Sequence, residues 1–157
     1  MTSSSDFSHL DAAGRMHMVD VSKKEVTRRV AEASCRVILS PQVVARIEEL
    51  PKGDALAAAR LAGIQGAKRT AELVPLAHPL PIEQIEVEVE PGDAGVTIHS
   101  RVVVTAKTGA ELEALVACST AALTLYDMVK AVEREAVITD LRLEAKSGGR
   151  SGSFRRS

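Results

Sequence analysis

Apolar and polar residues alternate along residues 30–39, which read VAEASCRVIL. Every second position carries an apolar or small side chain, namely Ala31, Ala33, Cys35, Val37 and Leu39. A period of two is typical of a strand with one buried face. We therefore predict the first strand in this segment.

Two helices are predicted after this strand. Ser40 is placed to act as an N-cap with Pro41 at the first helical position, which indicates a short helix. After the breaker PKGD, Asp54 can cap a second helix over residues 55–73. Because glycine costs about 1 kcal/mol against alanine inside a helix, the two glycines in this helix indicate close approach by another element. They belong to a seam of small side chains at Ala59, Gly63, Gly66 and Thr70.

The second half of the chain predicts a hairpin, a long helix and a last strand. Residues 85–90 alternate as IEVEVE, PGDAG turns the chain, and residues 96–106 return as the partner strand. Thr108 and Glu111 match the T-x-x-E capping box, and no proline interrupts the chain from there to about Arg134. VITDLRLEA then supplies the last strand.

This order of elements predicts an α+β fold of the ferredoxin-like βαββαβ type, with helices on one face of an antiparallel sheet. The first crossover helix is expected to be broken in two. We predict a flexible N-terminal arm at 1–14, a single ferredoxin-like domain at 15–147, and a flexible basic tail at 148–157. A fold of this kind does not by itself indicate a function.

Composition narrows the classes of function. The chain has 157 residues, 45% of them apolar and 26% charged, as in one soluble globular domain. No uninterrupted apolar run approaches the roughly 18 to 20 residues of a membrane span, and the first residues lack a hydrophobic signal core. We therefore expect a cytoplasmic protein that does not associate with membranes.

The net charge of −1 and the aromatic content of 2% disfavour a nucleic-acid partner, although a local positive cluster could still bind a small anion. The two cysteines, Cys35 and Cys118, are far apart and lack C-x-x-C spacing. We expect reduced, packed thiols and no zinc site.

Several ionisable residues interrupt the structural pattern, and each has a structural alternative. Lys52 lies in a glycine turn, where a lysine is usually solvated, and His78 lies between prolines, where it can simply bond to loop backbone. For Glu111 the capping box is the favoured explanation, whereas Glu113, two positions on, has no such role.

Asp127 and Lys130 are three residues apart and could form an ordinary helix pair worth a few tenths of a kcal/mol. Their neighbours, however, are apolar, and an ion pair in a largely buried helix is costly unless it is well satisfied. Partial burial also shifts a lysine toward acid–base work at neutral pH. The structural and the chemical explanations are about equally supported by this segment alone.

Glu113 and Asp127 lie fourteen residues apart, or roughly 21 Å along one continuous helix. They cannot share a small site within one chain. Since fourteen residues leave only about 40° of rotation, both side chains lie near the same helix face. We hypothesise that a second subunit brings the two residues together, and the small-residue seams are compatible with an oligomer.

Seven ordered motifs resemble the molybdenum cofactor biosynthesis protein C family, the cyclic pyranopterin monophosphate synthases. The motifs are HMVDVS, KGD, ARLAGIQGAKRT, LVPLAHPLP, TGAELEAL, ALTLYDMVKA and AKSGG, and the likeness runs from about Asp11 to Ser153. The resemblance implies a ferredoxin-like subunit in a hexamer, a trimer of dimers, with active sites at subunit interfaces. Residues 15–147 would then form the catalytic domain.

The reaction implied by the resemblance converts 3′,8-cyclo-7,8-dihydroguanosine 5′-triphosphate into cyclic pyranopterin monophosphate and pyrophosphate. A radical S-adenosylmethionine enzyme would supply the substrate. The implied catalytic residues are Asp127, Lys130 and Lys52. The implied substrate-binding residues are Leu76, Ala77, His78, Leu112, Glu113 and Lys146. No protein-bound metal or other cofactor is firmly implied, although Mg²⁺ could accompany the triphosphate.

Two positions depart from the pattern of some family members, since Ala77 replaces a cysteine and Leu112 replaces a methionine. Neither change removes an ionisable group that the reaction needs. The chemistry requires repeated proton transfers, which suit a carboxylate beside a lysine, and cations that meet the charge developing on phosphate. Lys68 and Arg69 could add positive field, or could only complement a helix C-terminus.

Two other functions remain open on the sequence. A non-catalytic ferredoxin-like regulatory module could bind a small ligand between subunits, and such a module would not need the pair of Asp127 and Lys130. A pterin or nucleotide hydrolase of other specificity is a weaker alternative.

Overall fold

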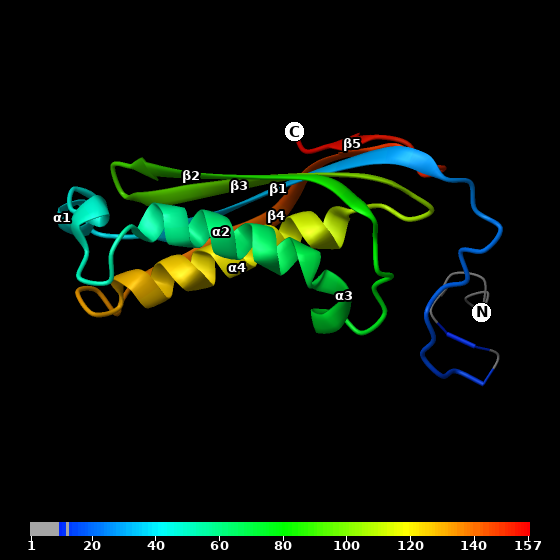
Figure 1. The fold of residues 1–157 in the computed structure, drawn as a ribbon, viewed down its shortest axis with the longest axis horizontal. Helices are drawn as coiled ribbons and strands as arrows, with labels where there is room; N and C mark the ends of the chain where they lie inside the picture. Colours follow the sequence, from blue (N-terminus) through cyan, green and yellow to red (C-terminus); the bar gives the residue numbers. More distant parts are fainter. Residues whose placement is uncertain (1–9, 12) are drawn as a thin grey trace.

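Helices cover one face of an antiparallel sheet in the computed structural model, which describes residues 10, 11 and 13–157 (Figure 1). The five strands lie in the order β2-β3-β1-β4-β5. The strands are β1 (Thr27–Ile38), β2 (Ile82–Gly92), β3 (Gly95–Ala106), β4 (Val137–Ser147) and β5 (Phe154–Arg155). The helices are α1 (Pro41–Val44), the 3-10 helix η2 (Ile47–Glu49), α2 (Ala55–Lys68), α3 (Thr70–Leu73) and α4 (Glu111–Val129).

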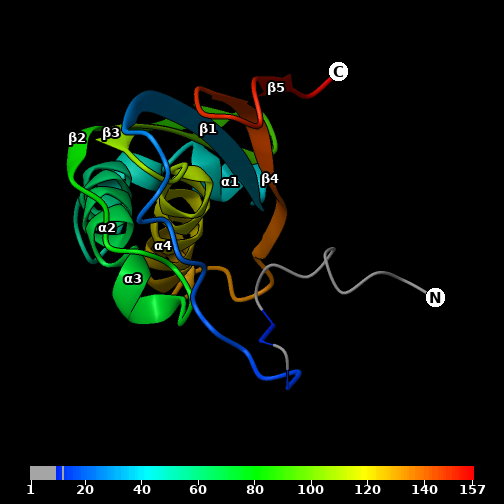
Figure 2. The ribbon, with the colours of Figure 1, turned by 90° about the vertical axis from the view of Figure 1, so that its right-hand side faces the viewer.

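The predicted ferredoxin-like fold is confirmed. Strand β1 pairs antiparallel with both β3 and β4, and β2 pairs with β3, which is the arrangement of the βαββαβ motif. The two-residue strand β5 adds a fifth strand beside β4. Figure 2, at right angles to Figure 1, shows α2 and α4 side by side beneath the sheet.

Alternating side chains divide the sheet into a buried face and an exposed face. The alternation predicted for β1 is confirmed, because Ala31, Ala33, Cys35 and Val37 are at most 1% exposed. On β2, Val87 and Val89 are buried while Glu86 and Glu88 are exposed. The helices therefore pack on the apolar face, and the opposite face is charged.

The glycines of α2 lie against α4, as the small-residue seam predicted. A Cβ atom added at Gly63 would lie 2.9 Å from the main-chain oxygen of Ala117, and one added at Gly66 would collide with Thr120. Contacts this short exclude larger side chains, so the two helices approach through their backbones.

Several predicted helix boundaries need correction. The helix predicted over 55–73 is divided at Arg69 into α2 and α3, and the long helix ends at Val129 rather than Arg134. Asp54 caps α2 as predicted, accepting a hydrogen bond from the Ala57 N–H at 2.9 Å. Ser40 precedes α1 but makes no capping bond; its N–H and hydroxyl donate instead to the Glu133 carboxylate.

Helix α4 is the core helix of the fold. By length and composition alone it could cross a membrane, which corrects the expectation that no apolar run approaches the length of a membrane span. Its small and apolar side chains instead pack in the protein core; Ala114, Ala117 and Cys118 are fully buried. The apolar character of α4 therefore reflects burial between α2 and the sheet.

The structure describes the C-terminal tail but only part of the N-terminal arm. The arm predicted at 1–14 lies mostly outside the described residues, because residues 1–9 and 12 are not described. The tail predicted at 148–157 includes a turn and β5, and its flexibility stays a prediction. The predicted domain at 15–147 contains β1 to β4 and all the helices of the described residues.

Candidate active site

Helix α4 carries ionisable residues at both of its ends. Glu111 and Glu113 lie in its first turn, and Asp127 lies near its last residue, Val129. Because the helix is continuous, about 1.5 Å of rise per residue separates Glu113 from Asp127 by roughly 21 Å. The two ends therefore belong to two separate sites on one subunit.

At the C-terminal end, one carboxylate holds two ammonium groups; we call Lys52, Asp127 and Lys130 the lysine–aspartate cluster. Asp127 Oδ1 lies 2.7 Å from Lys130 Nζ, and Asp127 Oδ2 lies 2.9 Å from Lys52 Nζ. Lys52 also donates to the main-chain oxygen of Asp127 at 2.8 Å. All three predicted catalytic residues therefore lie together.

The turn before α2 positions Lys52. Gly53 takes the left-handed conformation, with φ +100°, and its N–H donates to the Leu50 carbonyl at 2.9 Å. Asp54 then starts α2. This turn brings Lys52 to the end of α4 because α2 packs along α4.

The electrostatics of the cluster favour an ionised aspartate. Hydrogen bonds from Lys130 and then Lys52 lower the pKa of Asp127 to about 2. The expectation of a largely buried pair is wrong for the single subunit, since the side chains of Asp127 and Lys130 are 53% and 50% exposed. Asp127 lies in the last turn of α4, and Lys130 follows its last residue, Val129.

At the N-terminal end of α4, five of the predicted substrate-binding residues line one cavity of ≈ 550 Å³, which we call the loop cavity. The loop before β2 and the first turn of α4 supply them. They are Leu76, Ala77, His78, Leu112 and Glu113.

The imidazole of His78 connects the loop cavity to the segment before β1. Its Nε2 lies 2.9 Å from the carbonyl oxygen of Val19. Because a carbonyl only accepts, Nε2 carries the hydrogen in this contact. The sequence suggests that His78 could simply bond to loop backbone, and the structure contains such a bond. The ring also lines the loop cavity.

Glu113 is the buried acid of the loop cavity, with 4% exposure. Burial, with a further contribution from the charge of Glu111, raises its pKa to about 7. A carboxyl group with this pKa can take up or release a proton near neutral pH.

The predicted capping box at Thr108 and Glu111 is wrong. Helix α4 begins at Glu111 with Ala110 as N-cap, and no side chain caps it. The Glu111 carboxylate instead lies 3.4 Å from Lys146 Nζ. An ammonium group competes for the carboxylate, which the T-x-x-E pattern cannot reveal because it considers only local residues.

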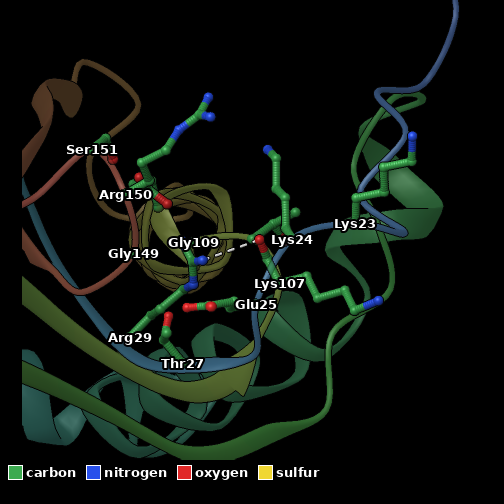
Figure 3. Close-up of a pocket in the computed structure, with 12 residues that line it drawn as sticks. Lys23, Lys24, Glu25, Thr27, Arg29, Lys107, Gly109, Gly149, Arg150 and Ser151 are labelled. Atoms are coloured by element: carbon green, nitrogen blue, oxygen red, sulfur yellow. Dashed lines mark hydrogen bonds between the residues drawn. The ribbon is translucent and has the colours of Figure 1, made fainter.

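A second cavity, of ≈ 680 Å³, lies beside the loop cavity, and we call it the basic cavity. The start of β1 and the segment before it, the loop after β3 and the turn after β4 supply its walls (Figure 3). Its cations are Lys23, Lys24, Arg29, Lys107 and Arg150. The two cavities share Lys24, Thr108, Gly109, Glu111 and Arg150.

Sequence reasoning missed the basic cavity. The adjacent lysines of KK at 23–24 and the basic residue after AKSGG were the available signals. Lys68 and Arg69, for which the sequence suggests a positive field or a helix C-terminal role, line neither cavity and lie at the C-terminal end of α2. Strand β1 begins at the edge of the sheet where β3 and β4 end, and this arrangement brings the five cations together.

Arg29 links the walls of the basic cavity. Its Nε donates to the Ala106 carbonyl and its Nη2 to the Lys107 carbonyl, each at 3.1 Å. Lys107 in turn donates to the Ser22 carbonyl at 2.7 Å. These bonds hold the loop after β3 and the segment before β1 in place around the cavity.

The chain is similar to known proteins along most of its length. The MoaC family model matches residues 18–149. A cyclic pyranopterin monophosphate synthase of Streptomyces griseus is 58% identical over 151 residues, covering 95% of this chain and 85% of the relative. The synthase of that name from Dinoroseobacter shibae is 55% identical over 155 residues, covering 96% and 98%. The match includes both ends of α4 and every residue that lines the two cavities except Arg150 and Ser151, and the chain belongs to the MoaC family.

Proposed function

We propose that this protein is a cyclic pyranopterin monophosphate synthase acting in molybdenum cofactor biosynthesis. The observation that supports the proposal most is the loop cavity, because five residues that the family resemblance implies as substrate-binding line it. The names of its relatives and the adjoining basic cavity agree with it. The substrate would be 3′,8-cyclo-7,8-dihydroguanosine 5′-triphosphate, made from GTP by a radical S-adenosylmethionine enzyme.

The two cavities suit different parts of this substrate. The loop cavity, with an imidazole and a buried carboxyl group, would hold the guanine-derived ring, and the basic cavity would hold the phosphates. Ammonium and guanidinium groups bind phosphate oxygens through charge-assisted hydrogen bonds. Lys146, whose ammonium contacts Glu111 at the border of the cavities, would add positive charge there.

The reacting groups would perform two kinds of chemistry. Opening and rebuilding the ring moves protons, for which Asp127, Lys130, Lys52 and Glu113 are suitable donors and acceptors. A ribose-derived hydroxyl then attacks the α-phosphorus and loses its proton. The bond from that phosphorus to the bridging oxygen breaks, and pyrophosphate leaves against the cations.

A site shared between subunits would join the two ends of α4. About 21 Å separates Glu113 from Asp127 in one subunit, so the lysine–aspartate cluster of one subunit would face the cavities of another. Leu61 and Leu123 are 68% and 61% exposed, which favours an oligomer. We propose a hexamer, a trimer of dimers, in the cytoplasm.

Mg²⁺ accompanying the triphosphate stays a prediction. Within residues 10, 11 and 13–157, no group of three or more histidine, cysteine, aspartate or glutamate side chains is arranged to hold a metal ion. A requirement for Mg²⁺ would therefore be expected to follow the phosphates. Turnover measured across a Mg²⁺ titration would test this.

The test of the function is to incubate the protein with the cyclic triphosphate and measure released pyrophosphate and the fluorescence of the oxidised pterin product. Pyrophosphate and the pterin product should form together in a 1:1 molar ratio. GTP offered in the same assay should release no pyrophosphate, which separates a synthase from a hydrolase. Binding of the cyclic triphosphate without turnover would support the regulatory module instead.

A further inference from the structure

The chain folds back after β4 so that Ser151 meets Lys146, five residues earlier. Lys146 Nζ donates to Ser151 Oγ at 2.6 Å, and Glu111 Oε1 lies 3.4 Å from the same ammonium group. The Lys146 side chain is only 23% exposed. Ser151 and Glu111, which are 40 positions apart in the chain, therefore hold this ammonium group between them.

Glycines determine the path that returns Ser151 to Lys146. Gly148 and Gly149 both take the left-handed conformation, with φ +89° and +76°. A Cβ atom at Gly148 would collide with the Arg28 carbonyl, and one at Gly149 with the guanidinium of Arg29. Because this turn is tightly packed on β1, the backbone at Ser151 has a defined position rather than an arbitrary one.

The partners of Lys146 connect it to the cavities. Lys146 itself lines a different cavity, beside Phe154, but Ser151 lines the basic cavity and Glu111 lines both the basic and the loop cavity. If the serine hydroxyl were removed, the Glu111 carboxylate would be the remaining partner. The ammonium group would then move toward the carboxylate, and its charge would be neutralised rather than offered to an anion.

We propose that Ser151 is a positioning residue that holds the Lys146 ammonium group away from full pairing with Glu111, so that it faces the anionic substrate. This inference rests on the proposed function. The hydroxyl accepts the lysine hydrogen, while the lysine keeps its remaining hydrogens for Glu111 and the substrate. Ser151 lines the basic cavity, and its hydroxyl acts on the substrate through the bond to Lys146.

Steady-state kinetics of four variants test the proposal. Ser151→Ala should raise KM about 5- to 10-fold and leave kcat within about twofold, since a positioned charge that serves binding acts on KM. Ser151→Thr keeps the hydroxyl and should restore KM. In the Lys146→Met background, Ser151→Ala should change KM no further. Ser153→Ala removes a neighbouring hydroxyl without a bond to Lys146 and is the matched control.

An unchanged KM in Ser151→Ala, or additive effects of Ser151→Ala and Lys146→Met, would overturn the proposal. The thermal midpoint and oligomer mass of each variant separate positioning from folding. If Ser151 were purely structural, Ser151→Ala would lower the midpoint, and any change in KM would not depend on the presence of Lys146. Should Ser151→Ala fail to fold, Ser151→Gly is the replacement at this exposed position.

The outcome is separable from the proposed function. If the wild-type protein makes no product, the function fails, and calorimetric binding of inorganic triphosphate replaces turnover as the readout. The same pattern is then expected in Kd: weakened in Ser151→Ala, restored in Ser151→Thr, and unaffected by Ser151→Ala once Lys146 is methionine. Equal affinities for wild type and Ser151→Ala would count against positioning.

Discussion

Lys52 Nζ lies 2.9 Å from Asp127 Oδ2, although 75 positions separate the two residues in the chain. The contact joins a glycine turn to the end of the core helix α4. It also explains why Asp127 is strongly acidic, since its carboxylate accepts hydrogen bonds from two ammonium groups.

Removing either partner of this contact should abolish most turnover and leave the fold intact. For Lys52→Ala and for Asp127→Asn we expect kcat to fall at least about 100-fold, the usual contribution of a proton-transfer group. The half-exposed position of these side chains predicts little loss of stability. Pyrophosphate release measures the activity, and size-exclusion mass and the thermal midpoint check the fold. Asp93→Asn, in an exposed turn, is the matched control. If Lys52→Ala or Asp127→Asn unfolds or becomes monomeric but keeps its activity per folded molecule, the substituted residue has a structural role and not a catalytic one.

Mixed oligomers test whether the two ends of α4 serve one site across subunits. Glu113→Ala and Asp127→Asn should each be inactive alone. After random subunit exchange at equal amounts, about a quarter of the shared sites should combine an intact Glu113 with an intact Asp127. Activity should therefore return to roughly that fraction of the wild-type value. Mass spectrometry of the mixture verifies exchange, and exchanged but inactive hybrids would argue strongly against the shared site.

Stability should depend on pH through Glu113. Its pKa is raised from 4.5 to about 7 in the folded protein, mainly by burial. Between these values the folded protein keeps a proton that the unfolded chain has released, so the free energy of unfolding falls as pH rises through this window. Glu113→Gln removes the penalty and should stabilise the protein at pH 8 by on the order of 3–4 kcal/mol, at about 1.4 kcal/mol per pKa unit.

Urea unfolding of wild type and Glu113→Gln from pH 4 to 8 measures this effect. The difference between them should be small near pH 4 and should grow up to about pH 7. Glu135→Gln, at an exposed position, serves as the control and should follow the wild type. Parallel curves for wild type and Glu113→Gln would contradict a raised pKa.

The helix seam predicts that alanine is destabilising where helix propensity alone would favour it. At Gly63 a Cβ atom would lie 2.9 Å from the Ala117 carbonyl and 3.1 Å from Val87 Cγ1. We expect Gly63→Ala to cost about 1–3 kcal/mol, as overpacked sites do, despite the better propensity of alanine. Gly92→Ala meets nothing closer than 3.9 Å and should be nearly neutral. Chemical denaturation compares the two, and equal stabilities would show that α2 and α4 can move apart freely.

Local patterns predicted the fold well because burial repeats with the period of each element. The alternation from Ala31 to Leu39 indicated which face of β1 enters the core, and Asp54 marked the start of α2. The same local reasoning failed at Thr108 and Glu111, because the partner of Glu111 is Lys146, which lies far along the chain. A capping pattern describes four consecutive residues and contains no information about a distant ammonium group.

The amino-acid sequence was sufficient for the order of the elements, the buried faces of the strands, the seam at Gly63 and, through its motifs, the family and the residues expected to act. The packing of the chain in three dimensions decided which of those residues meet: Lys52 with Asp127, the loop at His78 with Glu113, and Ser151 with Lys146. The physical reason is that periodicity and capping depend on neighbours within about four residues. Contacts across 75 positions depend instead on how closely α2 can approach α4 and on where the strands end together.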